Sequence, residues 1–246
     1  MKPEGWCSIE DLVRWGFARS LVVMANEAHN GMTRCIRTRE VGSRIIRAAH
    51  EVGVRRLAME ALPPPADGRP GPMTAVPVMD GGYLAQPDMR RLITTALDLG
   101  WSLWAYEARI DSGFDRTQLL SAEFTNWRER EQASNLCQVL AAAPGEPLLV
   151  WCGNSHASKI GTDDWLPMGY HFGAMSGVEA FVIDQAVTVD FPGALRPWLA
   201  DLLVTLADTL TDHGGTVGIL SDQAPPPLRG EYGVDALIVS NDNALT

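Results

Sequence analysis

Basic side chains are scarce in this sequence of 246 residues. It has 20 Lys and Arg against 30 Asp and Glu, which gives a formal net charge of −10. A surface with this balance repels phosphate backbones and anionic headgroups. We therefore expect no nucleic-acid or membrane partner, and we expect a small molecule or a peptide as the substrate.

Long apolar runs and paired cysteines are absent as well. The strongest apolar runs, Leu21–Ala25 and Leu148–Cys152, are far shorter than the roughly 20 residues that span a bilayer. Charged residues punctuate the start of the chain, which does not resemble a signal peptide. The four cysteines form no Cys-x-x-Cys pair, and a chain of this length needs no disulfides. These features predict a reduced, cytoplasmic protein.

The length suits one large core, and we find no internal repeat, so we expect a single domain over residues 1–246. Two proline triplets, Pro63–Pro65 and Pro225–Pro227, interrupt regular structure. The first opens a Gly- and Pro-rich stretch over residues 63–82. This composition predicts a long loop that serves either as a lid or as a plain surface excursion.

Strand-like and helix-like patterns alternate through the rest of the chain. Short apolar runs predict strands at Leu21–Ala25, Arg56–Met59, Trp101–Tyr106, Leu148–Cys152, Val217–Leu220 and Ala236–Ser240. Apolar residues at helical spacing predict helices at Arg34–Gly53, Met89–Leu99, Trp127–Ala142 and Leu195–Leu210. This order predicts an α/β fold with a mainly parallel sheet and helices on both of its faces.

Acidic and imidazole side chains follow four consecutive predicted strands. These residues are Glu27 and His29 after the first strand, Glu60 after the second, Glu107 after the third and His156 after the fourth. Sites in open α/β sheets collect at the carboxyl ends of the strands, so we expect the five side chains to share one site. Any one of them on its own could equally cap the helix that follows it.

Two kinds of chemistry fit such a set. Histidine shuttles protons near neutral pH, and an adjacent carboxylate fixes its tautomer and stabilises the imidazolium. This reading requires no cofactor. Alternatively, Glu27, His29, Glu60 and His156 would hold a divalent metal that activates water.

Arginines are expected to complete the site. Arg34 and Arg37 precede Val41 by seven and four residues, which places them on the inward stripe of their helix and leaves Arg39 rotated away. We therefore expect Arg34 and Arg37 to bind substrate.

On the helix before the fourth strand, Arg128 shares a stripe with Gln132 and Asn135. A guanidinium there could clamp a substrate carboxylate or stabilise an oxyanion. Its alternative is a surface ion pair with Glu129 or Glu131, the reading we favour for Arg130.

Two further residues are candidates of lower rank. His171 lies in the segment Gly169-Tyr-His-Phe-Gly173, which predicts an aromatic, glycine-rich loop where the imidazole either lines a pocket or packs. Cys152 is expected to be a small buried hydrophobe rather than a nucleophile.

The motifs resemble those of the erythromycin esterase, ChaN-like and Tiki superfamily. Asn26-Glu27-Ala28-His29 is similar to its Gly-Glu-x-His pattern, with Asn26 in place of glycine. The helix that begins Arg128-Glu129 and the later Gly153-Asn154-Ser155-His156 are similar to its Arg-Asp/Glu helix and second Gly-x-x-His, with Gln132 where Met is common. The resemblance covers about residues 20 to 240 in order.

This resemblance implies an α/β fold and three possible activities. In the esterase branch, a histidine that matches His29 activates water with help from acids that match Glu27 and Glu60. In the Tiki branch, the two histidines and the acids bind a divalent metal for peptide cleavage. In the haem-uptake branch, the fold binds a tetrapyrrole.

We therefore expect a hydrolase of an ester, lactone or amide bond. His29 would be the general base, oriented by Glu27 or Glu60, with His156 and Arg128 as catalytic partners. Substrate contacts would come from Arg34, Arg37, Glu107, Asn135 and His171. The alternatives are a metal-dependent peptidase, a group transferase, and a non-catalytic tetrapyrrole- or peptide-binding protein.

Overall fold

In the computed structural model, residues 1–27, 32–63, 69–76, 82–110, 116–119, 121–189, 197–228 and 233–241 are described. Within them, eight strands form one sheet in the order β3-β4-β2-β5-β1-β6-β8-β7. The strands are β1 (Val22–Glu27), β2 (Arg56–Met59), β3 (Pro72–Met73), β4 (Ser102–Ala105), β5 (Leu148–Gly153), β6 (Phe181–Val189), β7 (Thr216–Leu220) and β8 (Ala236–Asn241). The inner six are parallel, and the edge strands β3 and β7 pair antiparallel. The predicted mainly parallel α/β fold is confirmed.

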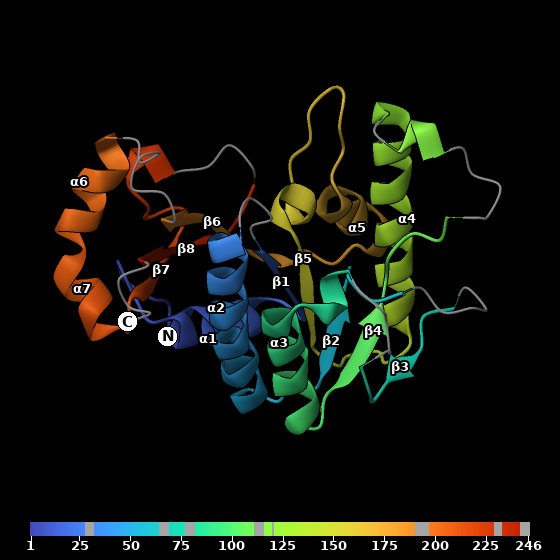
Figure 1. Ribbon diagram of the computed structural model, residues 1–246, viewed down its shortest axis with the longest axis horizontal. Coiled ribbons are helices and arrows are strands. Elements are labelled where there is room, and N and C mark those ends of the chain that lie inside the picture. Colours follow the sequence, from blue (N-terminus) through green and yellow to red (C-terminus); the bar gives the residue numbers. More distant parts are fainter. Residues whose placement is uncertain are drawn as a thin grey trace.

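Helices cover both faces of the sheet (Figure 1). The described α-helices are α1 (Ile9–Arg19), α2 (Met32–Glu51), α3 (Pro87–Asp98), α4 (Ala122–Ala141), α5 (Met168–Ser176), α6 (Pro197–Thr205) and α7 (Ala207–Asp212). Short 3₁₀ turns are η1 (Tyr83–Ala85), η2 (Arg116–Gln118), η3 (Asn154–Ala157) and η4 (Pro226–Leu228). No helix in the described part of the chain has the length and apolar character needed to cross a membrane.

The alternation of side chains along each strand divides the core into two layers. Val23 and Ala25 of β1 pack with α1, α2 and α3 on one face, whereas Val22 and Met24 pack with α4 and α5 on the other. Both layers are apolar because the parallel strands are buried on both sides. Glu27 follows Val23 and Ala25 in this alternation, so its side chain faces α2. Glu60, which follows β2, faces α4 instead.

Several predicted elements match the structure closely. The predicted strand Arg56–Met59 is β2 residue for residue, and the predicted helix Arg34–Gly53 corresponds to α2. Helix α4 begins five residues earlier than predicted, at Ala122, because Ser121 caps it by accepting the backbone N–H of Phe124. The predicted helix Leu195–Leu210 is divided at Leu206 into α6 and α7 within the described residues.

Of the loop predicted over residues 63–82, residues 64–68 and 77–81 lie outside the described part. Pro72–Met73 in its middle forms β3, which pairs with β4 at the edge of the sheet. The predicted loop around His171 is wrong, because that residue lies in helix α5. Gly169 serves close packing there, since a Cβ would overlap the carbonyl of Ala157.

Candidate functional site

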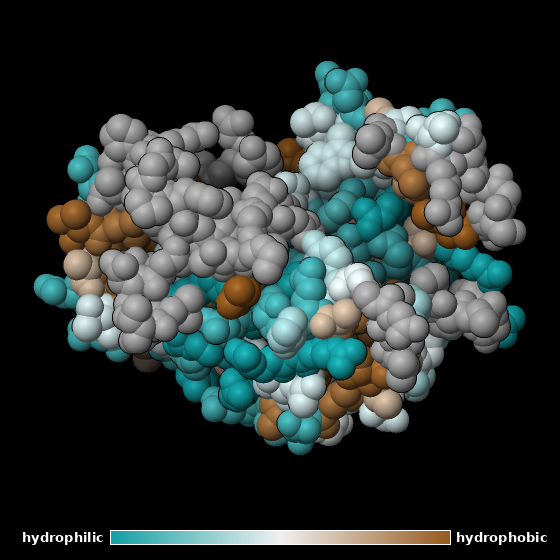
Figure 2. Space-filling model, in the orientation of Figure 1, coloured by the Kyte–Doolittle hydropathy of each residue, from teal (hydrophilic) through white to brown (hydrophobic). Residues whose placement is uncertain are grey.

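The four predicted strand ends lie side by side. β4, β2, β5 and β1 are consecutive in the sheet, and their parallel carboxyl ends meet at one edge. A cavity of about 380 Å³ opens there, and its lining includes Glu27, Glu60, Glu107, Arg128 and Trp151. On the face shown in Figure 2, hydrophilic side chains line the hollow beside α4 above these strand ends. The sequence-based grouping of the three carboxylates is therefore found in the structure.

Glu27 is held by a fork of two hydrogen bonds from Arg39. Nε donates to Oε2 over 2.8 Å and Nη2 donates to Oε1 over 3.0 Å. The indole Nε1 of Trp151 adds a third hydrogen bond, to Oε2 over 3.0 Å. Because Arg39 and Glu27 are both almost completely buried, this carboxylate is fixed in one orientation.

The expectation that Arg39 is rotated away is wrong. Arg39 shares a stripe of α2 with Ser43 and Ile46, and both of these residues are buried. Helix α3 and the turn before it cover this flank, and Asp88 and Gln86 both accept hydrogen bonds from Nη1 of Arg39. Burial lowers the pKa of Arg39, but the hydrogen bonds and charges of Glu27 and Asp88 outweigh burial and raise it above its usual range.

The two arginines predicted for this helix have different outcomes. Arg37 is buried as predicted, and its Nη1 lies 3.9 Å from Oε2 of Glu40 on the next turn. The side chain of Arg34 lies outside the described residues, as does all of His29. The sequence places His29 two residues after Glu27.

Arg128 connects the other two carboxylates. Its Nε donates to Oε1 of Glu107 over 2.9 Å, and its Nη2 reaches Oε2 of Glu107 at 2.5 Å and Oε1 of Glu60 at 2.6 Å. Gln132, one turn further along α4, donates to both oxygens of Glu107. The hydrogen bonds and charges of the carboxylates raise the pKa of Arg128 in spite of its burial.

Glu60 lies between Arg128 and His156. Burial favours its neutral form, but the charges of His156 and Arg128 and the backbone N–H of Gly153, which donates over 2.8 Å, outweigh burial. The pKa of Glu60 is therefore below its usual value, and the group stays ionised at neutral pH. A buried, ionised acid beside an imidazole at a strand end is a marker of a functional site.

His156 lies in η3, directly after β5. Its Nε2 is 3.8 Å from Oε1 of Glu60, and its Nδ1 is 2.5 Å from Oε1 of Glu129. Burial lowers the pKa of this imidazole, but the two carboxylates outweigh burial and the pKa is raised. The imidazolium is thus favoured, as a proton donor requires.

Sequence reasoning missed Glu129. This residue of α4 is 1% exposed and also accepts hydrogen bonds from the backbone N–H of Met168 over 2.6 Å and from Nε1 of Trp165 over 3.3 Å. The sequence predicts it only as a surface ion-pair partner of an arginine. Its position directly after Arg128, in the helix that resembles the superfamily's Arg-Asp/Glu motif, was the available signal.

Three other candidates occupy supporting or separate positions. Asn135 donates to the carbonyls of Tyr106 and Glu107 and so fixes the backbone that carries this carboxylate. Cys152 is buried as expected, and burial raises its thiol pKa well above the usual value. His171 lines a different cavity, between α4 and residues 163–171.

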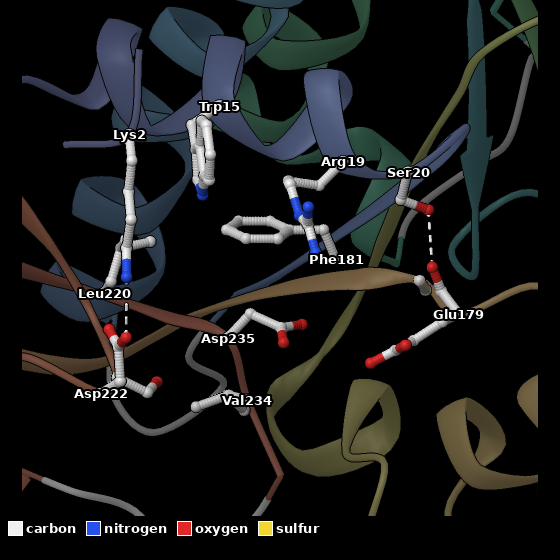
Figure 3. Close-up of a pocket in the computed structure, with 12 residues that line it drawn as sticks. Lys2, Trp15, Arg19, Ser20, Glu179, Phe181, Leu220, Asp222, Val234 and Asp235 are labelled. Atoms are coloured by element: carbon white, nitrogen blue, oxygen red, sulfur yellow. Dashed lines mark hydrogen bonds and ion pairs between the residues drawn. The ribbon is translucent and has the colours of Figure 1, made fainter.

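A further cavity of about 630 Å³ lies at the opposite, amino-terminal edge of the sheet (Figure 3). Several of its charged side chains form ion pairs near the surface, such as Lys2 with Asp222 at 2.9 Å. Asp235 similarly pairs with Lys159. Lys159 is shared between Asp235 and Glu179, but Glu179 is 85% exposed, and neither pair is buried as completely as Arg39 and Glu27.

Comparisons with known proteins give structural likeness only. No family model matches the chain, and no curated protein matches it in sequence. A solved structure titled "Bacterial protein toxins" is 14% identical, with a TM-score of 0.49 over 72% of this chain and 36% of that one. The type III effector HopBA1 is 16% identical, with a TM-score of 0.39 over 77% of this chain and 86% of that one.

A second toxin structure is 13% identical, with a TM-score of 0.44 over 72% of this chain and 37% of that one. The chain thus spans little more than a third of the length of the toxin chains. At these values the likenesses carry no argument about function, which must come from the site.

Proposed function

We propose that this protein is a hydrolase of an ester, lactone or amide bond, with its active site at the carboxyl edge of the sheet. The observation that carries the proposal is the buried, ionised Glu60 held between Arg128 and His156 beside an open cavity. Charges that are buried and shared in this way are costly to assemble for stability alone. The order of the motifs that resemble the erythromycin esterase, ChaN-like and Tiki superfamily also supports it.

In this proposal the two histidines share the proton transfers. His29 takes a proton from water as the oxygen of that water attacks the substrate carbonyl. Glu27, held by Arg39 and Trp151, is the fixed carboxylate two residues before that base in the sequence. His156 then donates its proton to the leaving oxygen or nitrogen as the bond to the carbonyl carbon breaks.

Arg128 is the candidate for the substrate contact. Its guanidinium lines the cavity and is held in place by Glu60 and Glu107. A guanidinium fixed before substrate binds can stabilise a developing oxyanion without reorganising during the reaction.

The described members of the expected metal-ligand set do not fit a metal ion. Both oxygens of Glu27 accept hydrogen bonds from Arg39, and those of Glu60 accept from Arg128 and Gly153. The Nδ1 of His156 faces Glu129. Among the residues that the structure describes, no three His, Cys, Asp or Glu side chains are grouped to hold a metal.

The test is hydrolysis of a panel of 4-nitrophenyl esters, lactones and peptide anilides by the wild type and His29→Ala. We expect His29→Ala to abolish turnover, because no other base is proposed for the water, while its thermal unfolding transition stays nearly unchanged. Full activity in this variant would refute the proposed mechanism.

Chelation separates the metal-dependent alternative. We expect turnover to persist after EDTA treatment and dialysis. Activity that EDTA removes and Mn²⁺, Co²⁺ or Zn²⁺ restores would instead establish the metal-dependent mechanism.

A further inference from the structure

A cavity of about 650 Å³ lies between α4 and residues 163–171, which include the first turn of α5. Phe124, Trp127, Trp165, Leu166 and His171 line it, and we call it the aromatic cavity. The rings of Phe124 and Trp127 lie 5.4 Å apart and are tilted by 38°. The charged lining residues Glu123, Arg130 and Asp163 are exposed and so form a rim. Its size is typical of small-molecule sites.

Two polar side chains of the aromatic cavity, Asn126 and Trp165, are paired with the protein. The amide nitrogen of Asn126 donates to the carbonyls of Ala122 and Asp164, and its oxygen accepts the backbone N–H of Leu166. The indole N–H of Trp165 donates a hydrogen bond to Glu129. At these two residues, a ligand would therefore meet the ring face of Trp165 rather than free donors.

His171 adds little charge to this cavity. Burial and the neighbouring Arg130 lower its pKa, so the imidazole is neutral at neutral pH. The interior thus favours an uncharged occupant, because a charged one would lose hydration without gaining a buried partner.

The aromatic cavity and the cavity of the proposed active site share no lining residue. The buried carboxylate of Glu129 lies between Trp165 of the aromatic cavity and His156. Oε1 of Glu129 is 3.3 Å from Nε1 of Trp165 and 2.5 Å from Nδ1 of His156. An apolar group bound against Trp165 would therefore be separated from the proposed proton donor, His156, by the carboxylate of Glu129. Glu129 is buried and held by the backbone of Met168, so the two rings keep a fixed spacing.

We propose that the aromatic cavity is the subsite for an uncharged aromatic group of the substrate, positioned beside the bond that is cleaved. The inference rests on the proposed hydrolase function and names the substrate class: esters or amides that carry an aromatic ring near the scissile bond. Trp127 and Trp165 supply the stacking faces, which recognise flat rings through offset or edge-to-face contacts.

The first experiment measures binding of N-phenyl-1-naphthylamine, an uncharged aromatic probe, by its fluorescence in the full-length protein. We expect one site, and we expect Trp127→Ala to raise the Kd about five- to tenfold, the loss of one aromatic contact. Trp127 is only half-buried, so the variant should fold. The matched control is Trp15→Ala, which makes the same truncation in the amino-edge cavity.

Trp165→Phe separates the contribution of the Trp165 ring from that of its N–H. Phenylalanine keeps a ring in the wall but removes the N–H that Glu129 accepts, so probe Kd should stay near that of the wild type. An unchanged Kd in Trp127→Ala, an absence of probe binding, or a Kd raised only in Trp15→Ala would overturn the subsite.

The two proposals fail separately. If the probe binds as predicted but no ester or amide is hydrolysed, the hydrolase function fails and the aromatic site stands. If hydrolysis occurs, Trp127→Ala should lower the ratio of kcat/KM for ethyl phenylacetate to that for ethyl butyrate. An unchanged ratio would refute the subsite while leaving the hydrolase intact.

Discussion

The two edges of the sheet carry charged side chains of the same kinds but in different arrangements. At the carboxyl edge, Arg39 and Glu27 are 1% and 3% exposed, and Arg128 serves two carboxylates at once. At the amino edge, Lys2 and Asp222 are 50% and 64% exposed and form a simple pair. Exposed pairs contribute little to stability, whereas a buried charge depends on its partner. Lys159 also pairs with Asp235 and Glu179 at the amino edge, but Glu179 is 85% exposed. Of the pairs compared, the most completely buried one, Arg39 with Glu27, lies at the carboxyl edge.

The largest effect on stability is expected from Arg39→Ala. The substitution removes the guanidinium that pairs with the buried Glu27, which should cost about 3–5 kcal/mol of unfolding free energy. Urea denaturation measures this loss, with Glu27→Gln and the double variant completing a cycle. Additive effects of the two substitutions would show that the pair is not coupled.

A smaller effect is expected from Arg128→Lys. An ammonium cannot reproduce the fork that contacts Glu60 and Glu107, so turnover should fall about 10²-fold, in the range for loss of one fixed donor. The loss should appear mainly in kcat. A fall confined to KM would mean that Arg128 binds the substrate and its transition state equally.

The titration of His156 compares the effects of its two neighbouring carboxylates, Glu60 and Glu129, on the pKa of the imidazole. Because Glu60 contributes to the raised pKa of His156, Glu60→Gln should lower that pKa, as read by NMR titration of the imidazole. Glu129 remains in place to hold Nδ1. An unchanged titration in Glu60→Gln would show that the 3.8 Å separation carries no interaction.

Stability should depend on pH in opposite directions for these two groups. The lowered pKa of Glu60 stabilises the fold at pH values above the pKa that this group has in the unfolded chain. This contribution is lost as the pH falls through the pKa of the folded state. The raised pKa of His156 stabilises the fold at pH values below the pKa that this group has in the unfolded chain. This contribution is lost as the pH rises through the pKa of the folded state. The free energy of unfolding of the wild type should therefore exceed that of Glu60→Gln by an amount that grows from pH 3 to pH 6.

The smallest effect is expected at the amino edge. Asp222→Asn removes the exposed pair with Lys2 and should change the unfolding free energy by less than about 0.5 kcal/mol. A loss comparable with that of Arg39→Ala would mean that the two edges are not as different as their burial indicates.

The sequence predicted the parts of the fold that depend on local pattern. Buried parallel strands are nearly continuous apolar runs, which is why Arg56–Met59 and Leu148–Gly153 were recognisable. β6 was missed because Asp184 and Gln185 interrupt its pattern. Both contact Asn26 of the neighbouring strand, a pairing that exists only after folding.

The candidate site was predictable where it follows strand ends and was not where it depends on helix packing. Glu27, Glu60 and Glu107 follow directly from the strand pattern. Arg39 could not be found from one helical stripe, because α2 is buried on a second flank by α3 and the turn before it. Glu129 was missed for the same reason, since α5 and η3 cover its side of α4.

The most direct test of the active-site proposal compares turnover of the substrate panel by His156→Gln and Asp222→Asn. Loss of the proposed proton donor should lower kcat by about 10²-fold or more, because general acid catalysis contributes 10²–10⁴. Asp222→Asn should keep the wild-type rate. Wild-type turnover in His156→Gln, or an equal loss in both variants, would contradict the placement of the active site at the carboxyl edge.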